Sequence, residues 1–287
     1  MPELPEVETI KEDLRELVVG ARIEGARVLD SALVEQPAST EEFVQRLRGI
    51  RITGARRRAK HLVIELDQGD SLVFQLKIGG QLLLVPPVPE PAKALMLVLD
   101  LEDDRRLFLR DETGYTRARM LYEEGLEERL AGLGPEPLGD DFGVEYLRET
   151  LSSRRAQIKP LLLDQKTIAG IGNIYADEIL FDARLHPRRK ANTLSGGEWE
   201  ALHSAILVNL RMGIEHRGTT FSLYRDVLGR KGHHQNYLRV FLRAGKPCPS
   251  LCGGEVVKEQ VGGRATFLCP QCQLENWRGG EQELILD

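Results

Sequence analysis

The sequence is poor in cysteine, has no excess of positive charge and lacks any long apolar segment. No segment is apolar enough to cross a bilayer, so no membrane partner is expected. The chain starts with acidic residues instead of the basic and apolar stretches of a secretory signal. These absences favour an intracellular, cytoplasmic protein. In a reducing compartment, four cysteines confined to residues 248–272 indicate metal ligation rather than a disulfide framework.

The charge distribution first argues against a nucleic-acid partner, because the net charge is −5 and phosphate binding needs positive surface. The charges are segregated, however. Residues 46–60 contain seven basic side chains and no acid, and residues 225–246 contain six basic side chains and one acid. Residues 121–150 contain nine acids and two basic side chains. Since a basic run is usually only a solvated face, charge alone leaves DNA binding open.

The length of 287 residues suits two domains. Apolar residues at helical spacing behind Pro5 predict an amphipathic helix over residues 6–19. From residue 22 to 122, runs such as HLVIEL, SLVFQL and LMLVLDL predict a mainly antiparallel β-sandwich. A segment rich in Gly, Pro and Asp then forms the best candidate linker. Helical periodicity returns at 144–151, 155–164, 174–183 and 196–214, and short strands follow it.

The cysteines predict a zinc site. They form two close pairs, Cys248 and Cys252, then Cys269 and Cys272. Four thiolates at these spacings suit tetrahedral coordination of one structural Zn²⁺. Gly262-Gly263, between two β-like runs, favours a hairpin turn with Arg264 just past its tip. The alternative is a set of four buried free cysteines.

A glycine-rich segment joins two predicted helices at residues 165–173 and ends in Gly170-Ile171-Gly172-Asn173. Its glycines allow the backbone to approach a partner closely, and Asn173 stands where a helix N-cap belongs. Free amides and the positive end of the helix dipole would then face an anion. Taken by itself, the segment is better explained as an ordinary capped helix.

The N-terminus offers a nucleophile. Once the initiator Met is removed, Pro2 carries a free secondary amine with Glu3 beside it. An α-amino group titrates near pH ~8, against ~10.4 for lysine, so a useful fraction is unprotonated at neutral pH. Condensed with a sugar aldehyde carbon, the amine gives a cationic iminium that favours β-elimination, with Glu3 placed as general acid or base. By itself, PELPE is also a common start of a helix.

Together these segments resemble the formamidopyrimidine-DNA glycosylase and endonuclease VIII family, and the formamidopyrimidine branch in particular. The matching segments are MPELPEVETI at 1–10, RRRAKHLVIEL at 56–66, GIGNIYADEILF at 170–181 and the zinc hairpin. They occur in the family's order and span almost the whole chain, so a chance match is improbable.

The resemblance implies an α+β multidomain fold. Its parts are an N-terminal catalytic antiparallel β-sandwich domain with flanking helices (1–131), a linker (132–143), a helix-two-turn-helix DNA-binding domain (144–237), a zinc-finger β-hairpin (238–276) and a C-terminal tail (277–287). We expect a monomer that binds damaged double-stranded DNA and is associated with the nucleoid while it acts there.

The resemblance also assigns catalytic roles. Pro2 corresponds to the Schiff-base nucleophile, Glu3 to the residue that transfers protons, and Glu6 to a residue that shapes the lesion pocket. Lys60 supports β-elimination and binds phosphate. The implied enzyme is a bifunctional glycosylase and abasic-site lyase of base-excision repair. It flips the damaged nucleotide out of the duplex, expels an oxidised or ring-opened base and cuts the strand by β- and δ-elimination.

Contacts with the DNA backbone are implied for the second half of the chain. Asn173 and Arg264 grip phosphates around the lesion, and Arg264 is also tied to δ-elimination. Gly170 and Gly172 are expected to lie against the DNA.

Several segments depart from the formamidopyrimidine branch. Ile78, in QLKIGG at 75–80, replaces a methionine that fills the void left by the flipped base. In DETGYT at 111–116, Gly114 replaces an arginine that pairs with the orphaned cytosine, and Tyr115 keeps an aromatic wedge. A phosphate-contacting histidine has no counterpart near residues 92–95, and the first cysteine pair encloses one extra residue. The chemistry is therefore expected to be retained, while selection of the lesion and of the opposite base is open.

Two other functions fit the same residues. One is a glycosylase for oxidised pyrimidines, or an abasic-site lyase, with little activity on 8-oxoguanine. The other is a non-catalytic binder of damaged DNA, although phosphate binding alone does not require an N-terminal proline.

Overall fold

The computed structural model describes residues 1–85 and 94–275 and divides into two compact units. Unit 1 contains Met1–Glu136 and Leu210–Tyr237, and unit 2 contains Pro137–Asn209 and the segment from Leu238 onward. The departure expected at residues 92–93 and the tail at 277–287 lie outside the described residues. The domain boundaries given by the sequence stay a prediction.

Unit 1 is built on two β-sheets. The first has the strand order β1-β7-β8-β6 and the second β2-β9-β5-β4-β3. Neighbouring strands are antiparallel except β2 and β9, which are parallel. The strands are β1 (Ile23–Val28), β2 (Val34–Gln36), β3 (Ile52–Arg58), β4 (His61–Leu66), β5 (Asp70–Gln75), β6 (Gly80–Val85), β7 (Leu95–Leu101), β8 (Arg106–Asp111) and β9 (Arg117–Tyr122). The predicted mainly antiparallel sandwich is thus confirmed.

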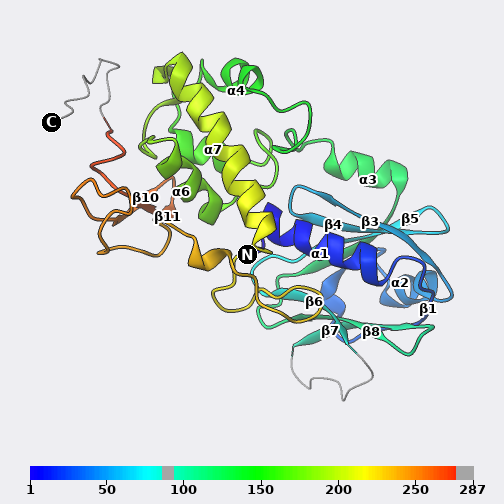
Figure 1. Ribbon diagram of the computed structural model, residues 1–287. Coiled ribbons are helices and arrows are strands. Elements are labelled where there is room, and N and C mark those ends of the chain that lie inside the picture. The colour runs from blue at the N-terminus through cyan, green and yellow to red at the C-terminus, as the bar shows by residue number, and fades with distance from the viewer. Residues whose placement is uncertain (86–93, 276–287) are drawn as a thin grey trace. The chain divides into compact units, whose positions relative to one another are not determined.

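Helices flank these sheets. They are α1 (Leu4–Leu17), the 3₁₀ turn η1 (Ser31–Leu33), α2 (Thr40–Leu47), α3 (Glu123–Leu130) and the 3₁₀ turn η3 (His234–Asn236). Helix α1, blue in Figure 1, packs on β3 and β4. Its apolar residues Val7, Ile10 and Leu14 join a core to which both sheets contribute. The core therefore fixes the start of α1, and with it the N-terminus, on the sandwich.

Strand β4 is apolar at successive positions because both of its faces are covered. Leu62 and Ile64 face the main core, whereas Val63 faces a second cluster with Val73 and with Leu126 of α3. Because successive side chains of a strand point to opposite faces, a strand covered on both sides is apolar throughout.

Unit 2 is mainly helical and ends in a two-stranded hairpin. Its elements are α4 (Val144–Leu151), α5 (Ile158–Leu163), α6 (Asn173–Asp182), the 3₁₀ turn η2 (Ala191–Thr193), α7 (Gly196–Glu215), β10 (Val257–Val261) and β11 (Arg264–Leu268). Helix α7 begins in unit 2 and ends in unit 1. A small core of Phe181, Val240, Val256 and Phe267 packs against the cysteines. Among the described residues, no helix has the length and apolarity that a membrane span needs.

Candidate active site and DNA-contact residues

Pro2 and Glu3 lie directly before α1. Both are buried, whereas Met1 is 53% exposed. Glu3 is the N-cap residue of α1, and Pro5 lies in the first turn, where its missing N–H breaks no helical hydrogen bond. The helix therefore starts at a defined residue and holds the backbone of Pro2 in place.

Glu6 ties this N-terminus to the segment that follows α7. Its carboxylate is buried; Oε2 accepts the Glu3 N–H at 2.8 Å and Oε1 accepts the Thr219 N–H at 2.7 Å. Gly218 has φ +80, and a Cβ placed there would lie 2.8 Å from Glu6 Cγ. Only glycine fits at this position. Sequence reasoning gave Glu6 a pocket role but missed Gly218 and Thr219, because a Gly-Thr pair after a helix is an ordinary turn signal.

Arg217 ties the same segment to α1 a second time. Its Nη2 donates to Asp13 Oδ1 and to Asp226 Oδ2, both at 2.7 Å. Burial acts to lower the pKa of Arg217, but the hydrogen bonds to these two carboxylates outweigh it and raise that pKa. The arginine stays charged, so the ends of the loop from 217 to 226 are both anchored. No local pattern in the sequence links these residues.

The basic run at 46–60 is largely neutralised within unit 1. Its arginines form ion pairs with acids that are mostly distant in sequence. The pairs are Arg46–Asp70 at 2.7 Å, Arg56–Glu65 at 3.0 Å, Arg57–Glu8 at 2.7 Å and Arg58–Glu136 at 3.0 Å. Lys60 lies partly exposed in the turn between β3 and β4, next to Ala59 with φ +53. The run is therefore a braced part of the sandwich that presents Lys60 at its end.

Asp111 and Thr116 together join the two loops that carry the expected wedge residues. Its Oδ1 accepts the Thr113 N–H at 2.7 Å, and its Oδ2 accepts the Thr116 N–H at 2.8 Å. Burial favours the neutral carboxyl, yet the hydrogen bonds from Thr113 and Thr116 prevail and lower the pKa of Asp111. Thr116 Oγ1 also donates to the Leu76 carbonyl at 3.0 Å. Residues 76–80 and 111–116 therefore form one braced unit.

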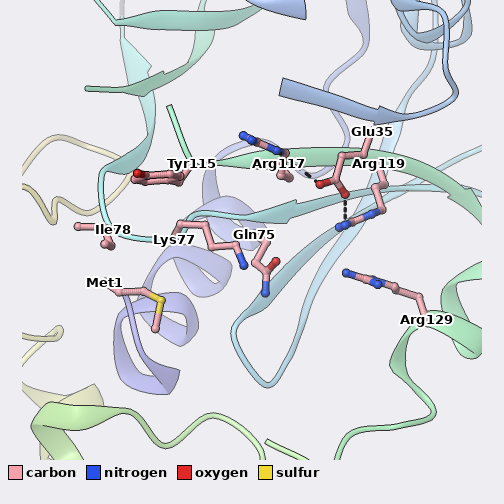
Figure 2. Close-up of a pocket in the computed structure, with 9 residues that line it drawn as sticks. All are labelled: Met1, Glu35, Gln75, Lys77, Ile78, Tyr115, Arg117, Arg119 and Arg129. Carbon is pink, nitrogen blue, oxygen red and sulfur yellow. Dashed lines mark ion pairs between the residues drawn. The ribbon is translucent and has the colours of Figure 1, made fainter. Parts of the chain in front are cut away.

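Ile78 and Tyr115 project from this unit. Ile78 is 54% exposed and Tyr115 is 60% exposed. Both line one cavity of about 540 Å³, together with Met1, which precedes Pro2. Figure 2 shows Ile78, Tyr115 and Met1 on the same side of this cavity. The structure thus brings the expected wedge residues close to the N-terminus.

Asn173 is not the N-cap of α6, contrary to the sequence prediction. The N-cap is Gly172, and Asn173 is the first helical residue. Glycine is an acceptable N-cap, so the asparagine side chain is not needed there. Its Nδ2 instead donates to the Ala265 carbonyl at 2.9 Å, next to Arg264. The helix start and the hairpin, far apart in sequence, are therefore in direct contact.

Gly170 also differs from the expectation of free amides. Its N–H donates to Gln165 Oε1 at 2.9 Å, while Gln165 Nε2 donates to the Ile171 carbonyl at 2.9 Å. Gly170 has φ +85, a conformation that favours glycine. The Gly170 amide thus serves the turn itself and is not open to an anion in this conformation.

The hairpin has the predicted form. Gly262 and Gly263 have φ +55 and +74, as a two-residue turn with left-handed central residues requires. Arg264 follows as the first residue of β11 and is exposed.

The four cysteines fit zinc. Their Sγ atoms lie within 4.8 Å of one another, and the Cys248–Cys272 and Cys252–Cys269 sulfurs are 3.6 Å apart. Bonds of ~2.3 Å to a tetrahedral ion give S–S edges of about 3.8 Å. The extra residue in the first pair is accommodated in an exposed turn, where Leu251 has φ +56.

Three family models match the chain. They are the Formamidopyrimidine-DNA glycosylase N-terminal domain over residues 1–118, the Formamidopyrimidine-DNA glycosylase H2TH domain over residues 133–225, and the zinc finger found in FPG and IleRS over residues 245–274.

Whole-chain relatives agree with these matches. The formamidopyrimidine-DNA glycosylase of Roseiflexus sp. (strain RS-1) is 43% identical, covering 95% of this chain and 100% of the relative. That of Herpetosiphon aurantiacus is 41% identical over the same shares. A complex between the Lactococcus lactis Fpg and an abasic site containing DNA has a TM-score of 0.89 at 32% identity, covering 95% of this chain and 99% of that one. A complex of the same protein with an oxidized pyrimidine containing DNA also has a TM-score of 0.89 at 32% identity, covering 95% and 100%.

Fold, zinc site and full-length similarity agree. The chain belongs to the formamidopyrimidine-DNA glycosylase family and is a zinc-containing DNA glycosylase of base-excision repair.

Proposed function

We propose that this protein is a bifunctional glycosylase and abasic-site lyase that excises oxidised or ring-opened bases from double-stranded DNA. The observation that carries the proposal is the position of Pro2 and Glu3. They are adjacent and buried at the start of α1, and Glu6 holds the Glu3 amide. A nucleophile and a proton-transfer group held at one point are what covalent base excision needs.

The proposed reaction begins after Met1 is removed. The Pro2 nitrogen bonds to C1′ of the flipped nucleotide, the glycosidic bond breaks, and the base departs with a proton. Glu3 transfers protons as the sugar ring opens to an iminium. Loss of a C2′ proton then breaks the C3′–O bond, and a second elimination breaks the C5′–O bond. Water finally hydrolyses the iminium, which releases the sugar remnant as an aldehyde and restores the Pro2 amine. Lys60 assists the first of these steps and Arg264 the second.

The substrates proposed here follow those of the relatives. The Lactococcus lactis protein has been crystallised with DNA containing an abasic site or an oxidized pyrimidine, and a mutant of it with Fapy-dG containing DNA. Damaged double-stranded DNA is the proposed partner of a monomeric enzyme. Lys60, Asn173 and Arg264 are proposed to bind phosphates, with Gly170 and Gly172 shaping the surface against the strand.

A second candidate keeps the chemistry but changes the lesion. The basis for this candidate is the pair of exposed side chains Ile78 and Tyr115, together with Gly114 in the loop. They favour an enzyme that acts on abasic sites and oxidised pyrimidines and only weakly on 8-oxoguanine. A non-catalytic binder of damaged DNA would not need a buried N-terminal proline beside Glu3.

Borohydride trapping tests the proposal. The wild-type protein should form a covalent adduct with an abasic duplex, because the iminium is reducible, and peptide mass spectrometry should locate it at Pro2. Pro2→Gly should trap more slowly, and protein that retains Met1 should not trap. Arg15→Gln, an exposed change on α1, is the control that should trap normally. If wild-type protein lacking Met1 traps nothing, the non-catalytic reading is preferred.

A further inference from the structure

The cavity beside Ile78 and Tyr115 is lined by an unusual concentration of cations. Four basic side chains contribute to its wall, namely Lys77, Arg117, Arg119 and Arg129. They come from three elements: Lys77 from the loop after β5, Arg117 and Arg119 from strand β9, and Arg129 from the last turn of α3. Figure 2 shows the nitrogen ends of Lys77, Arg119 and Arg129 turned toward the same space.

Among the described residues, a single acid, Glu35, lines the same cavity. It forms ion pairs with Arg119 and, at 3.5 Å, with Arg117. Within residues 1–85 and 94–275, Lys77 and Arg129 form no ion pair. The wall therefore holds four positive charges against one negative charge.

Among the described residues, Arg119 has an unsatisfied hydrogen-bond donor. The residue is only 9% exposed, and its Nη1 has no hydrogen-bond partner among the described residues. A buried guanidinium normally satisfies its N–H groups, because an unsatisfied buried donor costs about 1–3 kcal/mol. An acceptor supplied from the cavity would remove that cost.

The cations also repel one another. Burial lowers the pKa of Lys77, and the neighbouring charges of Arg119 and Arg129 lower it further. Burial and then Arg129 lower the pKa of Arg119. Lys77 moreover has φ +49, a backbone conformation that is strained for a residue with a side chain. A bound anion would offset this repulsion between the gathered cations.

We propose that this cavity is a phosphate-binding subsite, formed by Lys77, Arg117, Arg119 and Arg129, that holds one phosphodiester of the damaged DNA near the nucleotide attacked by Pro2. Met1 lines the cavity, so the Pro2 amine that its removal frees lies at the cavity's edge. A sugar whose C1′ bonds to Pro2 carries phosphates on its C3′ and C5′ oxygens, within a few ångströms of that nitrogen. Guanidinium groups bind phosphate with paired hydrogen bonds, which suits three arginines around one anion. The identity of the phosphate rests on the proposed function.

The test measures binding without chemistry, on a duplex with a tetrahydrofuran abasic-site analogue. Arg129→Gln and Lys77→Gln are the informative variants, because neither leaves an acid without its partner. Each should weaken binding by about tenfold at ~0.1 M salt and reduce the slope of log Kd against log salt by about one. Arg15→Gln, exposed on α1 and equal in charge change, is the matched control and should keep the wild-type slope. Informative variants that behave like this control would overturn the proposal.

A scan with neutral methylphosphonates identifies the phosphate. One phosphate of the duplex is replaced at a time. At the position that occupies the cavity, the replacement should weaken binding by the wild-type protein but should hardly change binding by Arg129→Gln, which has already lost the contact. A scan without any position that couples to Arg129 would overturn the assignment to DNA, even if inorganic phosphate competes for the cavity. If one phosphate position couples to Arg129 but borohydride traps no adduct, the subsite is upheld and the lyase reaction is refuted. The two proposals can therefore be refuted independently.

Discussion

Lys159 and Asp177 form an ion pair of 2.7 Å in which both side chains are completely buried. Lys159 Nζ also donates to Thr266 Oγ1 at 2.7 Å, and Asp177 Oδ2 accepts the Phe267 N–H at 2.9 Å. Thr266 and Phe267 belong to β11, the strand that begins at Arg264. The pair therefore attaches α5 and α6 to the zinc hairpin and sets where Arg264 is presented.

Replacing Lys159 by methionine should lower the free energy of unfolding by about 3–5 kcal/mol, because Asp177 is then buried without its cationic partner. Burial raises the pKa of Asp177 to about 7 even beside Lys159, so the carboxylate depends on that partner. Chemical unfolding at pH 8 measures the effect. The double variant Lys159→Met, Asp177→Leu should recover much of the loss, since no unpaired charge remains buried.

A matched control for this pair exists on the surface. Arg148 pairs with Glu145 on α4, and their side chains are 52% and 66% exposed. Arg148→Gln should change stability by less than about 1 kcal/mol, because solvent screens exposed pairs. Similar losses for Arg148→Gln and Lys159→Met would show that burial is not what makes the Lys159–Asp177 pair matter.

Cys269→Ser should abolish stoichiometric zinc and unfold the hairpin, because ligation and folding are coupled in so small a module. Cys269 is fully buried, and its N–H donates to Gln273 Oε1 at 2.9 Å. Elemental analysis should give one zinc per wild-type chain, and amide exchange at Thr266 should accelerate in the variant. Leu251→Ser, in the exposed turn between the first two ligands, should keep the metal. Wild-type protein purified without chelator but lacking zinc would contradict the site.

Stability should fall on acidification partly because of His61. Burial lowers its pKa from 6.5 to about 4, and the nearby charges of Arg129, Arg119 and Lys77 add to the effect. The unfolded chain therefore binds a proton before the folded one does, so stability present above pH ~6.5 is lost as pH falls toward 4. A shift of this size corresponds to about 3 kcal/mol.

Unfolding curves at several pH values between 7 and 4, compared with those of His61→Gln, isolate this contribution from the titration of carboxylates. The variant should lose less stability than wild type over this range. His233→Gln, which replaces an exposed histidine, should follow wild type. Parallel curves for wild type and His61→Gln would refute the assignment.

The fold could be predicted largely from local patterns. The runs HLVIEL and LMLVLDL became β4 and β7, and the periodicity at 144–151 became α4 with the same bounds. Helix α2 has the length of α4 and also buries two residues, but it was missed because it lies between β-like runs. Helix α3 was missed because it buries only Leu126. Periodicity over eight residues with one buried position is too weak to separate from a loop.

The site could be predicted only where a family motif marks it. Pro2 is next to Glu3, and the cysteines form two close pairs within residues 248–272. The cations around the cavity, in contrast, are spread from Lys77 to Arg129 and meet only in the folded sandwich. The basic run at 46–60 misleads for the same reason, because the acids that neutralise it, such as Glu8 and Glu136, are far away in the chain. Charge counted along a sequence does not report charge at a surface.

We expect weak discrimination among the bases opposite the lesion. In the formamidopyrimidine branch a loop arginine offers donors that match cytosine's acceptors, and a well-formed pairing of this kind discriminates by about 1–3 kcal/mol, roughly ten- to a hundredfold. Gly114 has no side chain to offer, and the segment 111–116 contains no arginine. Lys77 is the nearest cation in sequence to the wedge residue Ile78, but its side chain extends into the cavity with Arg119 (Figure 2).

Single-turnover excision of 8-oxoguanine opposite C, T, G and A measures this discrimination. Rates should be low and should lie within about tenfold of one another, while abasic sites are cut efficiently. Gly114→Arg should restore a preference for cytosine, since no atom lies within 4 Å of a Cβ added there, although φ +70 disfavours any side chain. Strong wild-type activity confined to the cytosine pair would mean that another donor has taken the arginine's place. In that case Lys77→Gln should abolish the preference, because Lys77 is the one cationic side chain in the segments 76–80 and 111–116.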